Sequence, residues 1–197
     1  MIYKLSDLAD IHSGVVLSRK EVPADCSAAI SYQRLTLRAL TESGNVLQSE
    51  LEQFFSREKL DEDLVTAVDD VIVRLCTPIN PVLIDHKQTG YLIPSQLAAI
   101  RVKDRSLLLS PYLRWYLSQK SILDALQAAE HGTAQRTIKV KSLADLEIAL
   151  PPIDIQKQIS EIDILSRKRE QLYQELILQE RLFSEHVIDT IMGGSKQ

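Results

Sequence analysis

The sequence has few aromatic residues and no long apolar run. Only 5% of its 197 residues are aromatic although 45% are hydrophobic, so Leu, Ile, Val and Ala must build the core. No stretch approaches the roughly 18 consecutive apolar residues that a membrane-spanning helix needs. The first residues, MIYKLSDLADI, lack the basic and then apolar layout of a signal peptide. These absences predict a cytoplasmic protein. The length of 197 residues fits one domain with an appendage, or two small domains.

Residues for catalysis, cofactor binding and metal binding are also scarce. Cys26 and Cys76 are isolated, which predicts free thiols rather than a disulfide or a metal site. The four histidines lie far apart, and the sequence has no glycine-rich nucleotide motif and no GxSxG motif. Acidic pairs such as Asp61 and Asp63 lie in an acidic run with no histidine partner nearby. We therefore expect a protein that is not an enzyme and binds no metal or cofactor, with a nuclease-type cluster of carboxylates and lysine as the open alternative.

Residues 1–150 contain short periodic segments that are typical of a mixed α/β domain. Residues 6–11 begin with Ser6, a residue of the N-cap type, and predict a short helix or turn. Several short β-branched or apolar runs are bounded by turn residues, which is the pattern of strands. These predicted strands cover residues 14–19, 29–37, 70–75, 81–85 and 97–102.

The clearest helix of this part is predicted over residues 110–132. Ser110 is placed as its N-cap, Pro111 takes the first helical position, and Gly132 is placed to end it. After a basic polar stretch, residues 143–146 predict a short helical turn that leads into a strand.

A pair of prolines, Pro151 and Pro152, divides the chain. Proline lacks a backbone N–H and its ring clashes with a preceding helical turn, so a helix cannot run back through this point. The composition changes there as well, because the 39 residues of 154–192 contain neither glycine nor proline. We therefore predict an α+β architecture, with a mixed α/β domain over residues 1–150 and one long helix over residues 151–197.

The helical pattern after the prolines predicts a coiled coil. Apolar residues recur every seven positions, as in a seam that faces another helix. At about 1.5 Å per residue the helix would be nearly 60 Å long. We expect it to pair with a helix of a second copy or of another protein, and packing onto its own domain is the alternative. Arg169 interrupts the seam and either sets the register or extends its charge to solvent. The predicted seam residues are Ile155, Ile159, Ile162, Leu165, Arg169, Leu172, Leu176 and Phe183.

Charge is divided unevenly between two segments. Residues 42–70 carry nine acidic and two basic residues, a net charge of −7, whereas residues 101–141 carry eight basic and three acidic residues, a net charge of +5. Opposite signs predict a polarised surface, whose basic part suits the phosphate backbone of a nucleic acid. The overall charge of −4 does not itself indicate such a ligand, and two ordinary solvated faces are the alternative.

Candidate DNA-contacting residues follow from the chemistry of base recognition, which needs Arg, Lys, Asn or Gln aimed into a groove. For each candidate, an ordinary exposed surface residue is the alternative. Residues 135–141 are the strongest group, because Gly132 ends a predicted helix just before them. The candidates for bases are Gln33, Arg34, Arg38, Gln96, Gln135, Arg136, Lys139 and Lys141, and those for phosphates are Arg19, Lys20, Arg101, Lys103 and Arg105.

Residues 131–159, HGTAQRTIKVKSLADLEIALPPIDIQKQI, contain an ordered series of motifs. These are Gly132-Thr133, Gln135, Ile138, the Leu-x-x-Leu-x-Ile run of residues 143–148, Leu150-Pro151-Pro152, and Gln156. The segment resembles the end of a target-recognition domain in the specificity (S) subunits of type I restriction–modification systems. Upstream, KLSDLADIHSGVVLSR, ISYQRL and SPYLRWYLSQ are similar to that family's opening, early strand and later helix. Residues 69–80 depart from its pattern, because the glycines expected there are missing.

The resemblance implies a non-catalytic, sequence-specific DNA-recognition subunit. Family members usually hold two recognition domains and two helices, so one of each implies a half-length form. Two copies would pair their helices in antiparallel fashion and read a bipartite, near-palindromic site. A methyltransferase subunit, possibly with a restriction subunit, would dock on the pair and would carry S-adenosylmethionine. A coiled-coil scaffold that does not read DNA is the alternative from another class.

Overall fold

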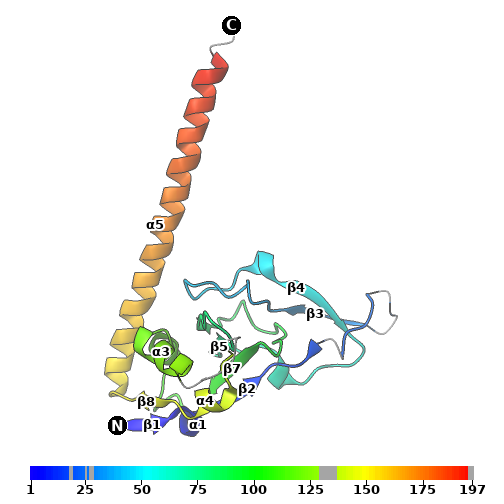
Figure 1. Ribbon diagram of the computed structural model, residues 1–197, viewed down its shortest axis with the longest axis vertical. Helices are drawn as coiled ribbons and strands as arrows, with labels where there is room; N and C mark the ends of the chain where they lie inside the picture. Colours follow the sequence, from blue (N-terminus) through cyan, green and yellow to red (C-terminus); the bar gives the residue numbers. More distant parts are fainter. Residues whose placement is uncertain (18–19, 25, 27–28, 129–136, 195–197) are drawn as a thin grey trace. The chain divides into compact units, whose positions relative to one another are not determined.

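The computed structural model describes residues 1–197 apart from 18–19, 25, 27–28, 129–136 and 195–197. Contacts divide the chain into two compact units, residues 1–160 and 161–197. The first unit combines short strands with helices, and the described part of the second is the continuation of one helix (Figure 1). The predicted fold class is therefore confirmed, while the pairing of the helix with a partner stays a prediction.

A four-stranded antiparallel sheet forms the centre of the first unit. Its order is β2-β7-β5-β6, with β2 at Ala9–Ser13, β7 at Leu97–Val102, β5 at Val71–Arg74 and β6 at Val82–Leu83. Apolar residues dominate β5 and β7, as expected for strands that are buried on both faces. Because alternate side chains point to opposite faces, Val71 and Val73 enter one apolar cluster while Ile72 enters another.

Different elements pack against the two faces of this sheet. Helices α2 (Ser110–Leu117) and α3 (Lys120–Ala128) belong to the cluster on the face of Val71, where Leu113 is fully buried. The irregular segment around Leu35 belongs to the cluster on the face of Ile72. Burying a leucine side chain contributes about 1.5–3 kcal/mol, so both faces hold the sheet in place.

A separate antiparallel hairpin consists of β3 and β4, and the 3₁₀ turns η2 and η3 lie before and after β4. Their bounds are Ile30–Arg34 for β3, Glu52–Ser56 for β4, Gln48–Glu50 for η2 and Glu62–Leu64 for η3. Phe54 of β4 is fully buried and packs with Leu17, Leu60 and Leu92 in a third apolar cluster. The sequence did not predict β4, which lies inside the acidic run.

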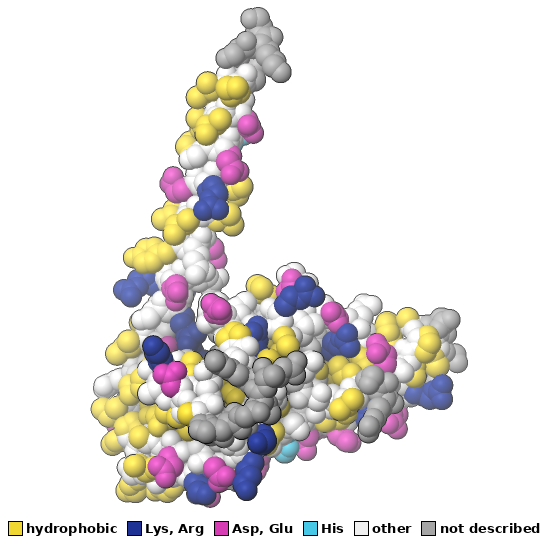
Figure 2. Space-filling model, in the orientation of Figure 1, with side chains coloured by type: hydrophobic (Ala, Val, Ile, Leu, Met, Phe, Trp, Pro, Cys, Tyr) yellow, Lys and Arg dark blue, Asp and Glu magenta, His cyan; other side chains and the backbone are white. Residues whose placement is uncertain are grey.

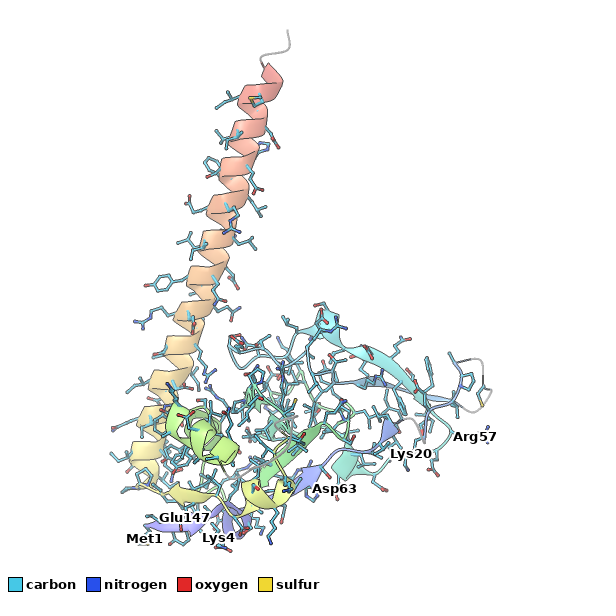
Figure 3. The ribbon with its side chains drawn as sticks, viewed as in Figure 1. Met1, Lys4, Lys20, Arg57, Asp63 and Glu147 are labelled. Carbon is cyan, nitrogen blue, oxygen red and sulfur yellow. The ribbon has the colours of Figure 1, made fainter. Side chains whose placement is uncertain are left out.

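The first and last parts of the domain meet in a second strand pair. Strand β1 (Ile2–Lys4) pairs in antiparallel fashion with β8 (Glu147–Ala149), and Figure 3 shows Lys4 and Glu147 close together. Lys4 Nζ donates to Asp145 Oδ1 at 2.9 Å. The short helices α1 and α4 are adjacent in sequence to these strands, and their bounds are Leu5–Leu8 and Val140–Ala144.

The last helix, α5 (Ile153–Gly194), begins directly after the two prolines, as predicted. The backbone N–H groups of Ile155 and Gln156 donate to Pro152 O at 2.9 and 3.1 Å. From residue 161 to residue 192 every side chain is exposed except those of Asp163 and Arg167, which are partly buried. Most of the length of α5 therefore contributes little to the core of the first unit.

Gln156 fixes the first turn of α5 to the domain. Its side chain is fully buried, and Oε1 accepts a hydrogen bond from the backbone N–H of Leu109 at 3.0 Å. Nε2 donates to the carbonyls of Leu107 and Pro151 at 2.9 and 3.0 Å. The side-chain amide of Gln156 thus links the first turn of α5 to the segment before α2 and to the proline pair.

Most of the predicted strands are confirmed. The predictions at 70–75, 81–85 and 97–102 correspond to β5, β6 and β7, and the prediction at 29–37 contains β3. The strand predicted at 14–19 is wrong over its described residues, because Val15 makes only an isolated bridge to Pro94. The helix predicted over residues 6–11 is confined to α1, since β2 already starts at Ala9.

The helix predicted over residues 110–132 is two helices over its described part. The break comes at Ser118 and Gln119, whose side chains both donate to the carbonyl of Trp115, at 2.7 and 3.1 Å. Ser110 is not the N-cap but the first helical residue, after Leu109 as N-cap. Gly132 lies outside the described residues.

Candidate nucleic-acid interface

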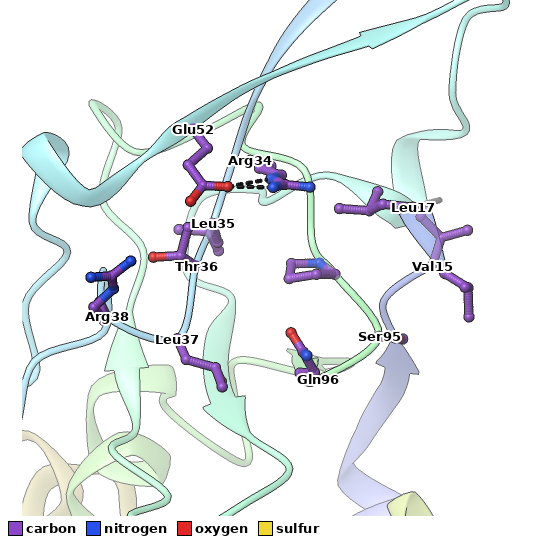
Figure 4. A pocket seen from close by; sticks show the side chains of 12 residues that line it. Val15, Leu17, Arg34, Leu35, Thr36, Leu37, Arg38, Glu52, Ser95 and Gln96 are labelled. Carbon is purple, nitrogen blue, oxygen red and sulfur yellow. Dashed lines mark hydrogen bonds and ion pairs between the residues drawn. The ribbon is translucent and has the colours of Figure 1, made fainter. Parts of the chain in front are cut away.

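Two adjoining cavities in the first unit bring several of the predicted DNA-contacting residues together. The first has a volume of about 400 Å³ and is lined by residues 15–17, 34–38 and 94–96 together with Glu52 (Figure 4). The second, of about 470 Å³, shares Leu37, Ser95 and Gln96 with the first and adds Leu75, Cys76, Thr77 and Thr137. We call the two cavities together the groove.

Hydrogen bonds to backbone carbonyl oxygens fix the walls of the groove. Arg74 of β5 donates through Nη2 to the carbonyls of Leu37 and Leu40, the latter at 2.6 Å, and so holds residues 37–40. Val15 N donates to Ile93 O at 3.0 Å on the opposite side. Sequence reasoning missed Arg74, although an arginine at the end of an otherwise apolar strand marks a residue with a buried polar task.

Gly14 is required for the close approach of two chain segments beneath the groove. A Cβ atom at this position would lie 2.1 Å from Ile93 O and 2.3 Å from Pro94 O, which are backbone atoms that cannot rotate away. The N–H of Gly14 also donates to Leu97 O at 3.0 Å. A residue without a side chain is needed wherever two backbones come this close.

Arg34 lies at the end of β3, directly opposite Glu52 in the hairpin. Its Nε donates to Glu52 Oε2 at 2.8 Å, and its Nη2 donates to the same oxygen (Figure 4). The arginine side chain is 29% exposed. A charge-assisted pair of this kind fixes the orientation of the guanidinium and offsets its charge, so Arg34 is positioned rather than mobile.

Gln96 and Arg38 are exposed polar residues of the first cavity. Gln96 is exposed, and its side chain points into the cavity in Figure 4, while its carbonyl accepts from Leu75 N at 2.8 Å. The Arg38 side chain is 82% exposed and has only a distant ion pair, 3.6 Å from Glu50. An amide can donate to and accept from adenine, and a guanidinium can donate twice to guanine. The cavity therefore offers the chemistry of base recognition.

The four described residues that are predicted to contact phosphates each form an ion pair within the chain. Arg101 donates to buried Asp70 at 2.9 and 3.0 Å and to Asp63 at 3.1 Å. The hydrogen bonds that Arg101 donates to Asp70 raise the pKa of Arg101 above its ordinary value. The remaining pairs are Arg105 with Asp69, Lys103 with Asp10, and Lys20 with Glu58, at 2.9, 3.4 and 3.2 Å.

The opposite charges of the two segments therefore partly cancel in the fold. Asp63, Asp69 and Asp70 of the acidic segment neutralise Arg101 and Arg105 of the basic segment. Figure 2 accordingly shows basic and acidic side chains interspersed over the visible face of the domain.

The other base-reading candidates are partly outside the described residues. Gln135 and Arg136 lie there, as does Arg19 among the phosphate candidates. Gln33 is exposed on β3, and Lys139 and Lys141 are exposed at the start of α4. The chain just before α4 is held against the domain, since Ile138 N donates to Leu75 O at 2.8 Å and Thr137 lines the second cavity. Residues 137–141 thus start beside the groove.

The predicted coiled-coil residues divide into two groups. Ile159 is partly buried against the core of the first unit, so this residue does not belong to an open seam. Ile155 is 42% exposed, and Ile162, Leu165, Leu172, Leu176 and Phe183 are each more than half exposed, while Arg169 is exposed beside them. Sequence reasoning missed a second set of exposed apolar residues outside the seam, which are Ile177, Leu178, Leu182, Ile188, Ile191 and Met192.

Two further findings concern the described residues only. Among them, no group of three or more His, Cys, Asp or Glu side chains could hold a metal ion. No helix in this described part of the chain has the length and hydrophobicity to cross a membrane.

The chain was compared with known proteins. The first solved structure, from a study of complex assembly and conformational transition of the type I R-M system, has a TM-score of 0.69 at 14% identity. The HsdS subunit from Thermoanaerobacter tengcongensis has a TM-score of 0.61 at 17% identity, and the type I S subunit from M. genitalium has 0.59 at 16%. The alignments cover 99%, 98% and 96% of this chain but 49%, 46% and 45% of those chains. This chain thus spans about half their length.

Sequence comparison identifies the family. No curated protein sequence matches this chain. The sequence model described as "Type I restriction modification DNA specificity domain" matches residues 1–176, which is most of the chain. The chain therefore belongs to the family of type I restriction modification DNA specificity domains.

Proposed function

We propose that this chain is a DNA-recognition subunit of a type I restriction–modification system and that it reads bases through the groove. The observation that carries this proposal is the meeting of exposed Gln96 and Arg38 on one cavity in a chain of this family. Their side chains come from segments almost 60 residues apart in the sequence, and each has the donors that distinguish base pairs in the major groove. Lys139 and Lys141 are exposed at the start of α4, close in sequence to Thr137 of the second cavity.

The chain would act as a non-catalytic, cytoplasmic subunit in a larger assembly. A second copy would supply the other half of a bipartite, near-palindromic target, since a two-fold dimer matches two half-sites. The exposed apolar residues of α5 form two sets, and we expect each set to bind a different partner. The seam would pack against another helix, and the second set, from Ile177 to Met192, would bind a different protein. That protein would be the methyltransferase subunit, which would bind S-adenosylmethionine, and a restriction subunit could join it.

The test is selection from random DNA by the purified chain together with its methyltransferase subunit, at low salt and with S-adenosylmethionine. Sequencing of the bound fraction should recover a bipartite motif. Gln96→Ala or Arg38→Ala should relax the preference at one base pair per half-site, at a cost of about 1–3 kcal/mol for the preferred base. Gln53→Ala, an exposed glutamine of β4 that does not line the groove, is the matched control. Recovery of no motif would refute the proposal.

A salt titration separates phosphate contacts from base contacts. Lys139→Ala should weaken binding of all sequences alike and reduce the slope of log affinity against log salt by about 1. Arg105→Ala should leave the slope unchanged, because the positive charge of Arg105 is already paired with Asp69 at 2.9 Å. A change of slope for Arg105→Ala but not for Lys139→Ala would move the phosphate contacts to the segment around Arg105.

A further inference from the structure

The seam of α5 has a pattern of polar interruptions that distinguishes possible helix pairings. Along the seam from residue 162 to residue 186 the order is Ile162, Leu165, Arg169, Leu172, Leu176, Gln179, Phe183 and His186. All of these side chains are exposed in the structure. In a coiled coil each seam residue faces a seam residue of the partner, and a polar side chain facing an apolar one lowers stability. The positions of Arg169 and Gln179 therefore limit how a second helix can be placed.

A parallel, in-register pair of identical helices is disfavoured by this sequence. It would place Arg169 against Arg169 and His186 against His186 in the same layers. Two arginines in one layer repel each other and cannot both be hydrogen-bonded there, and unpaired charge at an interface is costly. An antiparallel pair avoids both contacts.

Among antiparallel pairs, one register matches polar with polar and apolar with apolar. With the two-fold axis beside Gln174, Arg169 faces Gln179 of the second copy, while two layers of purely apolar composition flank this contact. These layers are Leu172 with Leu176 and Leu165 with Phe183. The remaining layer, Ile162 with His186, is the only mixed one between residues 162 and 186.

Shifts by one heptad lose this match. A shift in one direction sets Arg169 against Leu172 and Ile162 against Gln179, which buries two polar groups against apolar ones. A shift in the other direction sets Leu176 against Gln179 and Leu165 against Thr190. Each shifted register therefore has at least two mixed layers on each side of the axis, whereas the favoured register has one.

The distribution of charge favours the same arrangement. Residues 167–169 are three consecutive bases, whereas residues 175–189 carry four acids and one base. In the favoured register Glu180 of the second copy lies at the height of Arg169 and on the same side of the seam. Opposite charges at such flanking positions determine partner choice and orientation in coiled coils. Each copy thus presents a basic segment where the other presents an acidic one.

We propose that α5 binds a second copy of this chain in the antiparallel register in which Arg169 of each copy contacts Gln179 and Glu180 of the other. This inference deepens the proposed function, on which its biological use rests. The two-fold axis beside Gln174 would place the Ser160 positions of the two copies about 42 Å apart along the helix axis. The register would in this way fix the separation of the points where the two α5 helices leave their domains.

Mixed disulfide cross-linking tests the register directly. Cys26 and Cys76 are first changed to Ser, and single-cysteine variants with different tags are mixed in pairs and oxidised. Leu165→Cys mixed with Phe183→Cys should give the main cross-linked heterodimer. Leu165→Cys with Leu176→Cys, and Leu172→Cys with Phe183→Cys, report the two shifted registers and should give little product. A dominant product from either shifted pair overturns the register.

A charge exchange provides a second measurement that does not remove apolar side chains. Arg169→Glu and Glu180→Arg should each weaken dimerisation roughly tenfold in analytical ultracentrifugation, and the double variant should recover most of the loss. No recovery would overturn the contact between these residues. A monomeric mass at high concentration, with no cross-link in any mixture, would overturn pairing with a second copy. Neither readout involves DNA, so selection of a motif from random DNA remains a separate test of the proposed function.

Discussion

Replacement of Gln156 by alanine should destabilise the first unit more than any other single change at the start of α5. The wild-type amide makes three hydrogen bonds, at 2.9 to 3.0 Å, from a fully buried position. A typical net contribution is about 1 kcal/mol per hydrogen bond, and a buried donor left without a partner costs about 1–3 kcal/mol. Leu107 is exposed, so water can replace the bond to its carbonyl. The expected loss of unfolding free energy is therefore about 2–4 kcal/mol.

Fluorescence of Trp115 during urea unfolding provides the measurement. Trp115 is the only tryptophan of the chain and packs against the core of the first unit, so the signal excludes unfolding of the exposed part of α5. The matched control is Gln158→Ala, two residues later on the same helix, where the side chain is exposed and the expected change is under about 0.5 kcal/mol. Equal midpoints for the two variants would refute the assigned role of the Gln156 hydrogen bonds.

Three further predictions concern other parts of the first unit. Gly14→Ala should lower the urea midpoint by the equivalent of about 2–4 kcal/mol, because its Cβ would lie 2.1 Å from Ile93 O; a wild-type midpoint would contradict this contact. Asp70→Asn should cost about 1–3 kcal/mol, because it removes the charged acceptor of two hydrogen bonds from Arg101, which is partly exposed and keeps its ion pair with Asp63; the check is the thermal midpoint, and an unchanged midpoint would show that the pair is dispensable. Burial raises the pKa of Tyr112 to about 12, and since the neutral form is favoured in the folded state, its contribution to stability should be present below pH 10 and lost as the pH rises through about 12. In ultraviolet titration, the difference between the folded wild type and folded Tyr112→Phe should appear near pH 12 and not near pH 10. A difference that is complete by pH 10.5 would contradict the shift.

The sequence predicted elements that depend on local patterns and missed those that depend on contacts between distant residues. The sequence predicts strand β7 and the start of α5 because a six-residue run with five apolar residues and a proline pair are local signals. The break between α2 and α3 was missed, since it depends on whether Ser118 and Gln119 donate to Trp115 O rather than continue the helix. Local pattern alone does not decide that competition.

The candidate site shows the same division. Gln96, Arg34 and Arg38 were predicted by residue type, but their meeting on one cavity follows from the pairing of β3 with β4 and from the loop before β7. The pairing of Arg101 with Asp63 and Asp70 could not be predicted, because it joins positions more than 30 residues apart across the sheet. The net charge of each segment therefore did not indicate which basic side chains are available to bind phosphates.

The pairing of β1 with β8 has a consequence for how target preference could change in evolution or by design. The chain enters the domain at Ile2–Lys4 and leaves it at Glu147–Ala149, and these two strands are neighbours. Everything that shapes the groove lies between them. A block whose two ends are adjacent can be exchanged as one cassette without moving its surroundings. Under the proposed function, a new block that restores this strand pair and the buried glutamine at position 156 would bring a new target preference to an unchanged helix.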